Sequence, residues 1–411
     1  MNIIVIGAGI AGTCAANYLL RDGHDVVLID GSPPGSGCSY GNAGSLSAGS
    51  CVPLSVPGLL RQLPRWLYDP LGPLRIRKRY LLRALPWLVR FILAGKASEI
   101  DAKADAMLNL HRNVIASYTE LLKGTGGMDL FRVSGVLQAY KSAKPLDTSL
   151  DWRLREARGV SQKIVTATEL RDMVPDLSVD YRQGILLPQH GVVVAPQLFV
   201  QALAERFVAD GGRLVQARVH NFLPPSSGGD VLGIRSALGD MAADRVVLCA
   251  GAWSMRLLSS IGINVPLETQ RGYHAMALGA NVKPPLPIVA SEAKIYATPM
   301  LEGLRLAGTV EFAGLDAVPD FRRAEAALKL GKEMFPKLEY NGVEEWMGHR
   351  PCLPDSLPVI GQVPGIRTLF VNFGHGHYGM TAAPESAILL AALVSERPPP
   401  FDPMPYRVDR F

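Results

Sequence analysis

Residues 1–12 read Met-Asn-Ile-Ile-Val-Ile-Gly-Ala-Gly-Ile-Ala-Gly, an apolar, β-rich run that passes directly into a G-x-G-x-x-G turn. An alanine-rich segment follows, and a second apolar run over residues 26–29 ends at Asp30. This order predicts a strand, a tight turn, a helix and a second strand that ends in an acid.

Each glycine of the turn has a separate physical use. Gly7 permits the tight turn, Gly9 lets the backbone approach a pyrophosphate, and Gly12 lets the helix pack on the strand. The start of the helix directs free N–H groups and a positive dipole end at the phosphates. Asp30 can accept hydrogen bonds from a ribose. The stretch therefore predicts a dinucleotide site, and the alternative is a glycine-rich turn in an ordinary α/β protein.

Composition indicates a folded enzyme of two domains. The chain has 411 residues, of which 48% are hydrophobic, and this length exceeds one ordinary core. Its net charge of +5 is modest, and we predict no nucleic-acid partner. The first strand begins at residue 3, so we expect no signal peptide and a cytosolic N-terminus. Five cysteines lack C-x-x-C or metal-type spacing, so we predict reduced thiols and no metal site: Cys14, Cys38, Cys51, Cys249 and Cys352.

Periodicity places further elements along the chain. It predicts helices over residues 97–123, 197–209, 324–334 and 384–395, and a short capped helix from residue 167. It also predicts a strand pair around Gly135 and a buried parallel strand from Arg245.

Glycine-rich turns recur at three distant points, namely at Gly7, at residues 249–254 and at residues 372–381. A nicotinamide enzyme would leave the last of these without a use. A discontinuous nucleotide domain instead suits a long cofactor that runs through the protein.

Four motifs together give a specific resemblance. They are the N-terminal fingerprint with Asp30, the run Ser39-Tyr-Gly-Asn-Ala-Gly-Ser45, residues 346–361, and residues 373–381. The chain resembles the FAD-dependent D-amino acid oxidase superfamily, and within it the bacterial D-amino acid dehydrogenases. The resemblance implies an α/β fold with a Rossmann-like discontinuous FAD-binding domain (residues 1–60, 180–265 and 345–411). It also implies an α+β substrate-binding domain with a mixed or antiparallel sheet (residues 61–179 and 266–344).

The resemblance assigns residues to FAD, which we expect to be bound non-covalently, although Cys352 lies beside the predicted substrate arginine. The pyrophosphate, ribose, adenine and isoalloxazine contacts that it implies are Gly7, Gly9, Ile10, Ala11, Gly12, Asp30, Ser39, Asn42, Ala43, Gly44, Val219, Gly251, Gly374, His375, Gly376, Gly379, Met380 and Thr381. For His375 and His377, local packing or hydrogen bonding is the alternative interpretation.

Arg350, in the run Gly-His-Arg-Pro, matches the position at which the superfamily binds the substrate carboxylate. A planar guanidinium fork binds a carboxylate through two bonds and stays charged. The alternative is a structural arginine that satisfies backbone carbonyls. Tyr273, Tyr296 and Tyr378 are candidates for a second substrate contact, and His274 is a weaker one. No residue is identified as a general base.

The resemblance implies an FAD-dependent dehydrogenase that transfers a hydride from Cα of a D-amino acid to flavin N5. The imino acid is then hydrolysed to a 2-oxo acid and ammonia. An oxygen-using oxidase of glycine, sarcosine or a cyclic imino acid such as a D-hydroxyproline is the alternative, and a non-catalytic flavin subunit is a more distant one. The resemblance also implies a respiratory-chain quinone or another electron acceptor as partner.

Residues 60–96 form a basic, apolar insert, with arginines at positions 79, 83 and 90 and Pro86 on one helical face. The insert is too interrupted to span a bilayer, but it suits a helix lying on anionic lipid. The protein would then be cytoplasmic and peripheral on the inner face of the membrane. The alternative is a helix that packs on the protein with its arginines outward.

Overall fold

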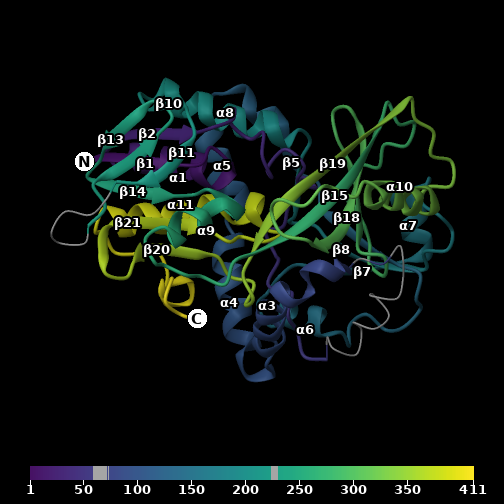
Figure 1. The fold of residues 1–411 in the computed structure, drawn as a ribbon. Helices are drawn as coiled ribbons and strands as arrows, with labels where there is room; N and C mark the ends of the chain where they lie inside the picture. Colours follow the sequence, from purple (N-terminus) through teal and green to yellow (C-terminus); the bar gives the residue numbers. More distant parts are fainter. Residues whose placement is uncertain (59–71, 73, 224–229) are drawn as a thin grey trace.

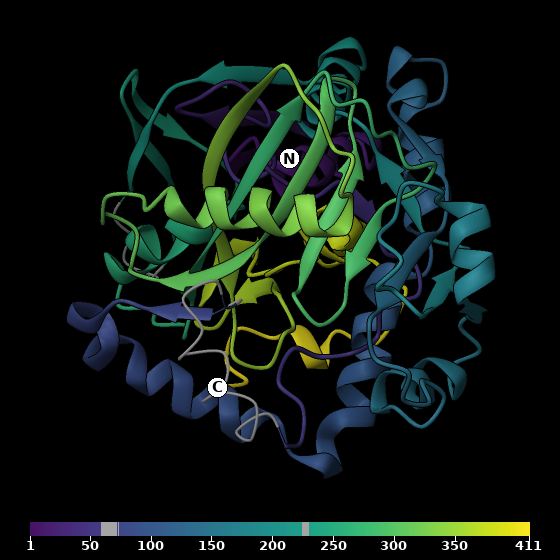
Figure 2. The same ribbon diagram turned by 90° about the vertical axis from the view of Figure 1, so that its right-hand side faces the viewer.

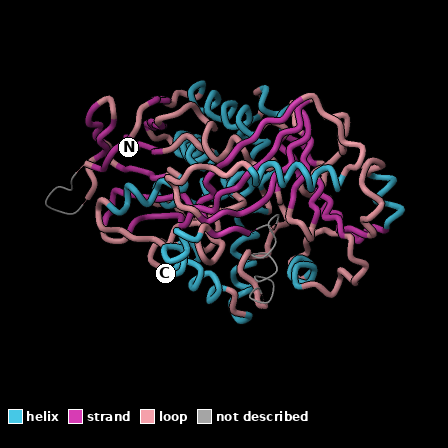
Figure 3. The backbone as a smooth tube through the Cα atoms, turned by 45° about the vertical axis from the view of Figure 1, so that its right-hand side comes forward, coloured by secondary structure: helices cyan, strands magenta, loops and turns pink. Residues whose placement is uncertain are grey.

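The computed structural model describes residues 1–58, 72, 74–223 and 230–411. Two large sheets lie side by side in it, one near each end of the molecule (Figure 1). Helices surround them, and the long strands of the second sheet are prominent in Figure 3.

The first sheet has six strands. Their order is β10 (Arg213–Gln216), β2 (Asp25–Asp30), β1 (Asn2–Ile6), β14 (Arg245–Leu248), β21 (Ile366–Phe373) and β20 (Val359–Val363). All neighbours pair in parallel except β20, which is antiparallel to β21. Because β1, β14 and β21 are adjacent and parallel, the three glycine-rich turns that follow them meet at one edge of the sheet.

Helices cover one face of this sheet and form a common core with it. They are α1 (Ile10–Arg21), α4 (Ile100–His111), α5 (Val114–Leu122), α8 (Pro196–Ala209) and α11 (Gly379–Val394). The other face packs against α9 (Ser254–Ser259) and a three-stranded sheet of β11 (Val219–Phe222), β12 (Gly233–Ser236) and β13 (Gly239–Ala242).

Helix α11 begins five residues before Pro384, where the sequence had predicted its start. Proline lacks an N–H, so it leaves the carbonyl four residues earlier without its helical donor. That carbonyl belongs to Met380, and it accepts a hydrogen bond from the Tyr118 hydroxyl at 2.7 Å. A buried side chain of α5 thus compensates for the proline and lets α11 extend to the glycine-rich turn.

The second sheet has nine strands and is mostly antiparallel. Its order is β19 (Gly342–Cys352), β15 (Glu268–Leu278), β18 (Gly303–Phe312), β17 (Ile295–Pro299), β16 (Ile288–Ala290), β6 (Val136–Tyr140), β8 (Gln183–Leu187) and β7 (Lys163–Thr166), with β4 (Leu74–Ile76) beside β18. Helices α7 (Ala167–Met173) and α10 (Arg322–Met334) pack on it, and Figure 2 shows α10 crossing the strands. The predicted cap of α7 is confirmed, because Thr166 and Glu169 form a capping box.

The remaining elements connect the two halves. A small sheet contains β3 (Ser45–Leu46), β9 (Gly191–Val193) and β5 (Phe131–Val133), and two further helices are α3 (Leu81–Ala94) and α6 (Leu150–Glu156). Short 3-10 turns are η2 (Lys78–Tyr80), η3 (Ala97–Glu99), η4 (Gly126–Leu130), η5 (Gly251–Trp253) and η6 (Met404–Tyr406).

Several sequence predictions need correction. The segment 97–123 is two helices, α4 and α5, rather than one. The strands flanking Gly135 are present but are not a pair, since the chain turns at this glycine (φ 75°) and β5 and β6 join different sheets.

The predicted domain boundaries also shift. Helices α4 and α5, assigned to the substrate half, share the core of the six-stranded sheet because their apolar faces pack on α11 and α8. Strand β8 and most of β19, assigned to the FAD half, belong to the nine-stranded sheet. Residues 59–71, which include the start of the predicted basic insert, lie outside the described residues.

Candidate active site

A cavity of about 1510 Å³ runs between the two sheets. One end lies at the carboxyl edge of the six-stranded sheet, where Gly7, Asp30 and Gly251 line it. The other end lies against the nine-stranded sheet and is lined by Arg350 and Tyr296. Because small-molecule pockets usually measure about 300–1,000 Å³, this cavity has room for an extended cofactor and a second ligand.

The first turn of α1 forms one end of the cavity. Gly7 has φ 108°, and a Cβ on Gly12 would lie 1.8 Å from the Gly7 carbonyl oxygen. The backbone therefore comes too close at this turn for any side chain. The N–H of Ile10 donates to Ser39 Oγ at 3.1 Å. The N–H of Ala11 also lies in the first turn, where no intrahelical acceptor is available, and it borders the cavity.

Asp30 lies at the end of β2, beside this turn. Its two carboxylate oxygens accept the backbone N–H groups of Ala8 at 2.8 Å and of Ser32 at 2.9 Å. Each oxygen retains a free lone pair, so the carboxylate can also accept a ribose hydroxyl.

The loop that contains Asn42 and Ala43 is held from the nine-stranded sheet. Arg305 of β18 donates through Nη1 to the carbonyls of Tyr40 at 3.0 Å and Asn42 at 2.6 Å. Burial lowers the pKa of Arg305 to about 10, which still leaves the guanidinium charged at neutral pH. Arg305 thus fixes a backbone that lines the cavity.

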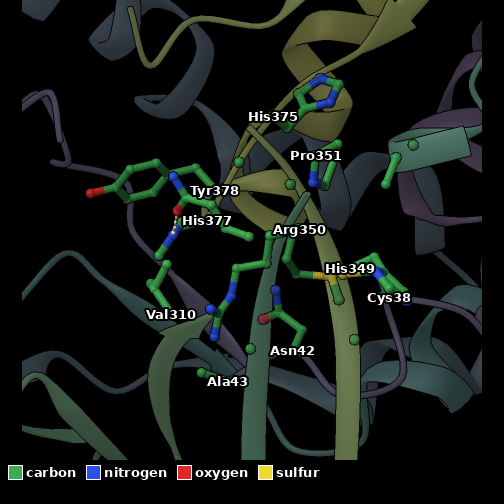
Figure 4. Close-up of a pocket in the computed structure, with 18 of the residues that line it drawn as sticks. Cys38, Asn42, Ala43, Val310, His349, Arg350, Pro351, His375, His377 and Tyr378 are labelled. Atoms are coloured by element: carbon green, nitrogen blue, oxygen red, sulfur yellow. Dashed lines mark hydrogen bonds between the residues drawn. The ribbon is translucent and has the colours of Figure 1, made fainter. Parts of the chain in front are cut away.

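The C-terminal glycine motif supplies the opposite wall. His377 lines the cavity and its Nε2 lies 3.1 Å from Gln270 Oε1, whereas His375 Nε2 lies 3.1 Å from Ser386 Oγ inside the protein. Figure 4 shows the His375 ring directed away from Arg350, His377 and Tyr378. Burial lowers the pKa of both histidines to about 3, so both rings are neutral at pH 7.

Most of the predicted FAD residues border the cavity, and three do not. Gly12 packs under the Gly7 carbonyl, Gly44 approaches the Val193 carbonyl, and Gly374 packs on Leu353. These three glycines therefore shape the backbone behind the wall. Those that line the cavity are Gly7, Gly9, Ile10, Ala11, Asp30, Ser39, Asn42, Ala43, Val219, Gly251, His375, Gly376, Gly379, Met380 and Thr381.

Arg350 projects from β19 into the cavity, across a gap in the neighbouring strand β15. That gap is Gly272, since a Cβ there would lie 2.1 Å from the Arg350 guanidinium carbon. Arg350 Nη1 donates to the Thr309 carbonyl at 2.8 Å, and within the described residues it forms no salt bridge. Burial lowers its pKa. A half-buried cation that faces a cavity, with no carboxylate partner in the described part of the chain, is suited to bind an anionic ligand.

The three candidate tyrosines separate. All three border the cavity, but the hydroxyl of Tyr273 has different surroundings from those of Tyr296 and Tyr378. The Tyr273 hydroxyl instead donates to Glu311 Oε2 at 2.6 Å and accepts the Asp320 N–H at 3.1 Å, and its ring packs near Phe321 at the start of α10. Successive side chains of a strand point to opposite faces, so Tyr273 is on the far side from Gly272 and does not suit the predicted substrate contact.

His274 faces the cavity side but is packed. Its ring stacks on Trp346 with centroids 5.2 Å apart, and its Nδ1 lies 3.3 Å from the Gly41 carbonyl oxygen. Burial lowers its pKa to about 3. His274 therefore supports the loop that contains Gly41, which agrees with the weaker role given to it from the sequence.

Orphaned polar atoms test whether the cavity fits a cofactor. Thr309 Oγ1 and both amide atoms of Asn372 are buried without a hydrogen-bond partner, and both residues line the cavity. Thr309 also has φ 59°, a conformation that is costly for a β-branched residue. Buried polar groups are normally paired, so these atoms, together with the free N–H groups of α1, fit a polar ligand such as FAD.

Sequence reasoning missed Thr309, Asn372 and Gln270. Asn372 lies in the quoted glycine motif and could have been included with it. Thr309 and Gln270 lie in ordinary strand sequence, and only their conformation and neighbours distinguish them.

Comparisons with known proteins agree with this geometry. The family model described as FAD dependent oxidoreductase matches residues 2–393. A D-amino-acid oxidase from Bradyrhizobium diazoefficiens is 38% identical, and the match covers 100% of this chain and 99% of the relative. A D-amino acid dehydrogenase from Vibrio cholerae is 29% identical over 96% of this chain and 95% of the relative.

Solved structures share the fold. Glycine oxidase from Geobacillus kaustophilus has a TM-score of 0.75 at 22% identity, covering 100% of this chain and 98% of that one. L-Proline dehydrogenase from P. horikoshii has a TM-score of 0.74 at 18% identity, covering 100% and 97%. The predicted fold class is confirmed.

Proposed function

The chain belongs to the FAD-dependent oxidoreductase family, and on this premise we propose that it oxidises the Cα–N bond of a D-amino acid. The product is an imino acid, which water converts to a 2-oxo acid and ammonia. The relatives at 38% and 29% identity are both named for D-amino acids, which supports this substrate class. Their names differ in the electron acceptor, one being an oxidase and the other a dehydrogenase.

The observation that carries the proposal is the environment of Arg350. Arg350 is half-buried, faces the cavity through the gap at Gly272, and among the described residues has only backbone carbonyls of β18 as hydrogen-bond partners. A substrate carboxylate supplies the missing negative charge, and the planar fork fixes its orientation. Tyr296 and Tyr378 border the space in which the remainder of the amino acid would lie.

FAD, when bound, supplies the two-electron acceptor for the reaction. The first turn of α1 would hold its pyrophosphate, Asp30 its ribose, and the start of α11 its isoalloxazine edge. We propose that binding is non-covalent. Cys38 is the thiol that lines the cavity near Arg350, and burial raises its pKa to about 11, which keeps it protonated and unreactive.

Anaerobic mixing tests the substrate class. The yellow protein is mixed with matched D- and L-amino acids, and flavin absorbance is followed. Bleaching by D-amino acids, at rates at least tenfold above those of the L-enantiomers, is the expected result. Bleaching by glycine, sarcosine or a cyclic imino acid alone would transfer the protein to the oxidase-type alternative.

For the electron acceptor, we propose a quinone at an anionic membrane rather than oxygen. Helix α3 supports this, because its outward face carries two largely exposed apolar side chains: Leu82 is 82% exposed and Leu93 57%. Leu85 and Val89 are nearly half exposed and also border the cavity. On its inner face, Ala84 and Trp87 are buried. In the alternative interpretation from the sequence, the arginines would occupy the outward face.

Basic residues flank this apolar face. Arg83 and Arg90 are exposed on α3, and Arg75, Lys78 and Arg79 are exposed just before it. Arg77 is an exception, since its Nε donates to Glu311 at 2.7 Å. An apolar strip between cations is the pattern of a helix lying on anionic lipid. No helix among the described residues is long and apolar enough to cross a bilayer.

Vesicle-binding assays separate the contribution of the apolar face of α3 from that of the basic residues around it. Leu82→Ser with Leu93→Ser removes the apolar face, and Lys78→Gln with Arg79→Gln and Arg83→Gln removes charge, whereas Arg77 is left in place. Each variant should lose binding to anionic vesicles and keep its flavin and its turnover with a soluble dye. If wild-type protein does not bind anionic vesicles, the membrane proposal is wrong. It is also wrong if the protein reduces oxygen as fast as it reduces quinone.

A further inference from the structure

Besides the two ends described above, the cavity has a third, polar region, of which the proposed reaction uses only the bordering Tyr296 and Tyr378. It lies beside β6 and α6, and Tyr140, Asp151, Arg155, His190 and Ser291 line it together with Tyr296 and Tyr378. The wall of this one cavity includes Arg350, Tyr378 and Arg155. The space between Arg350 and this region is therefore continuous.

Arg155 is a buried cation in this region. Arg155 is only 4% exposed, and its Nε donates a hydrogen bond to Gln162 Oε1 at 2.8 Å. Gln162 is fixed in turn, because its Nε2 donates to the Trp152 carbonyl at 2.9 Å. Arg155 Nη2 is buried and has no hydrogen-bond partner in the part of the chain that the structure describes. Within the described residues, no carboxylate comes within 4.0 Å of the Arg155 guanidinium.

His190 supplies a second unpaired donor. The residue is 3% exposed, and its Nε2 accepts the Gly49 N–H at 3.1 Å. The accepting nitrogen carries no proton, so the proton of the neutral ring is on Nδ1. That Nδ1 is buried without a partner. Burial and the nearby Arg155 cation lower the pKa of His190 to about 3, which keeps the ring neutral.

Acidic groups near this region leave the two donors free. Glu292 is exposed and already accepts the backbone N–H groups of Lys141 and Ser142 at 3.0 and 3.1 Å. Asp151 is half-buried, one helical turn before Arg155. A buried arginine and a buried N–H donor without acceptors are each costly, and an anion that accepts from both would remove the cost.

We infer that Arg155 and His190 bind a carboxylate on the substrate side chain, so that the preferred substrate is a dicarboxylic amino acid. This inference rests on the proposed function, in which Arg350 holds the α-carboxylate. Arg155 is then a specificity-determining residue, and Gln162 is the positioning residue that orients its guanidinium.

Binding of unreactive acids tests the anion site without turnover. Glutarate and succinate carry two carboxylates, and butyrate carries one. Calorimetry should show that the better of the two dicarboxylates binds wild-type holoenzyme about tenfold to hundredfold more tightly than butyrate, the range expected for a charge-assisted hydrogen bond. Arg155→Met should remove this preference. Arg153→Met, at an exposed position of the same helix, should retain it.

Turnover tests the assignment to the side chain. In wild type, kcat/KM for D-glutamate or D-aspartate should exceed that for the matching amide, D-glutamine or D-asparagine, by tenfold or more. Arg155→Met should abolish the difference and leave kcat/KM for D-norvaline within about threefold. Gln162→Leu should reduce the difference mainly through KM. Flavin content and melting temperature confirm that each variant is folded.

Other outcomes are equally informative. Equal binding of glutarate and butyrate by wild type would overturn the inference. An equal loss for all substrates in Arg155→Met would assign Arg155 to the shared α-carboxylate, and loss of flavin would assign it to the cofactor; both contradict a side-chain site. Rapid oxidation of D-norvaline without preference for D-glutamate or D-aspartate would refute the inference and leave the proposed function intact. Failure of every amino acid to bleach the flavin would refute the function, whatever glutarate does.

Discussion

The two faces of the nine-stranded sheet around β15 carry similar residue types in opposite states. On the face toward α10, Arg271 is fully buried and donates to the carbonyls of Gly314 at 2.9 Å and Ala317 at 2.5 Å. Its Nη1 also lies 3.7 Å from Glu311 Oε2, and that carboxylate accepts from Tyr273 as well. On the cavity face, Arg350 reaches past Gly272 and has no carboxylate partner among the described residues.

The difference shows how a structural arginine is distinguished from a ligand-binding one. Arg271 is fully buried and Arg350 is half-buried, so burial separates them only in part. Arg271 has acceptors for its guanidinium groups within the protein, whereas among the described residues Arg350 has only backbone carbonyls of β18. A cation that is partly withdrawn from bulk water favours a negatively charged partner, so the partner of Arg350 is expected to arrive with the substrate.

Arg350→Met should have the largest effect on catalysis. It removes two charge-assisted hydrogen bonds of about 1.5–3 kcal/mol each, so kcat/KM should fall by two orders of magnitude or more. Arg350→Lys keeps the charge but loses the planar fork, so its kcat/KM should still be at least tenfold below that of wild type. Both variants should keep their FAD and melting temperature. A smaller loss of kcat/KM in steady-state assays would show that Arg350 does not bind the substrate carboxylate.

Arg271→Met should have the opposite profile. It orphans buried carbonyls and leaves Glu311 with Arg77 as its remaining cation, so the free energy of unfolding should fall by about 3 kcal/mol. In denaturant titrations this variant should be clearly destabilised. Its kcat/KM per bound flavin should stay within about twofold of wild type, and a selective loss of turnover would blur the distinction between the two faces.

Acidification should destabilise the protein through its buried histidines, including His274 on the cavity face. The pKa of His274 is about 3 in the folded protein against 6.5 in a model peptide, so below pH 6.5 the unfolded chain binds more protons. Its contribution to stability is therefore complete above pH 6.5 and is lost as the pH falls toward 3. In His274→Gln, the slope of unfolding free energy between pH 6 and 4 should decrease by up to about 1.4 kcal/mol per pH unit. His220→Gln, at an exposed position, is the control and should retain the wild-type slope.

Tyr273→Phe should have the smallest effect. The change removes one hydroxyl that bonds Glu311 and the Asp320 N–H, so stability should fall by about 1 kcal/mol. KM for a D-amino acid should be unchanged, because this hydroxyl is on the α10 face. A fivefold rise in KM would return Tyr273 to the list of substrate contacts.

The fold could be predicted well where local sequence and long-range packing agree. The G-x-G-x-x-G turn requires close backbone approach whatever surrounds it, and the residues after β1, β14 and β21 were recognised as one site before their strands were known to be adjacent. The strands around Gly135 were misassigned because strand propensity does not say which sheet a strand joins. The start of α11 was misplaced because the Tyr118 hydroxyl, from a distant helix, compensates for Pro384.

The site could be predicted only in part, for a related reason. Arg350 lies in a recognisable motif, but Arg155 and His190 are ordinary residues in their local sequence. Their importance comes from donors left without acceptors, which depends on the whole surrounding structure. Tyr273 was chosen for its chemistry, yet strand alternation placed its hydroxyl on the other face.

The adjacency of β1, β14 and β21 also determines when the cofactor site can form during synthesis. Ile4 leaves the ribosome long before its partner Val246, and Leu369, the partner of Val246, follows much later still. Contacts so distant in sequence close slowly. The cofactor cradle therefore cannot be completed until the last helix has emerged. A nascent chain interrupted before α11 would expose the apolar surface that this helix covers, and it would depend on chaperones at that stage.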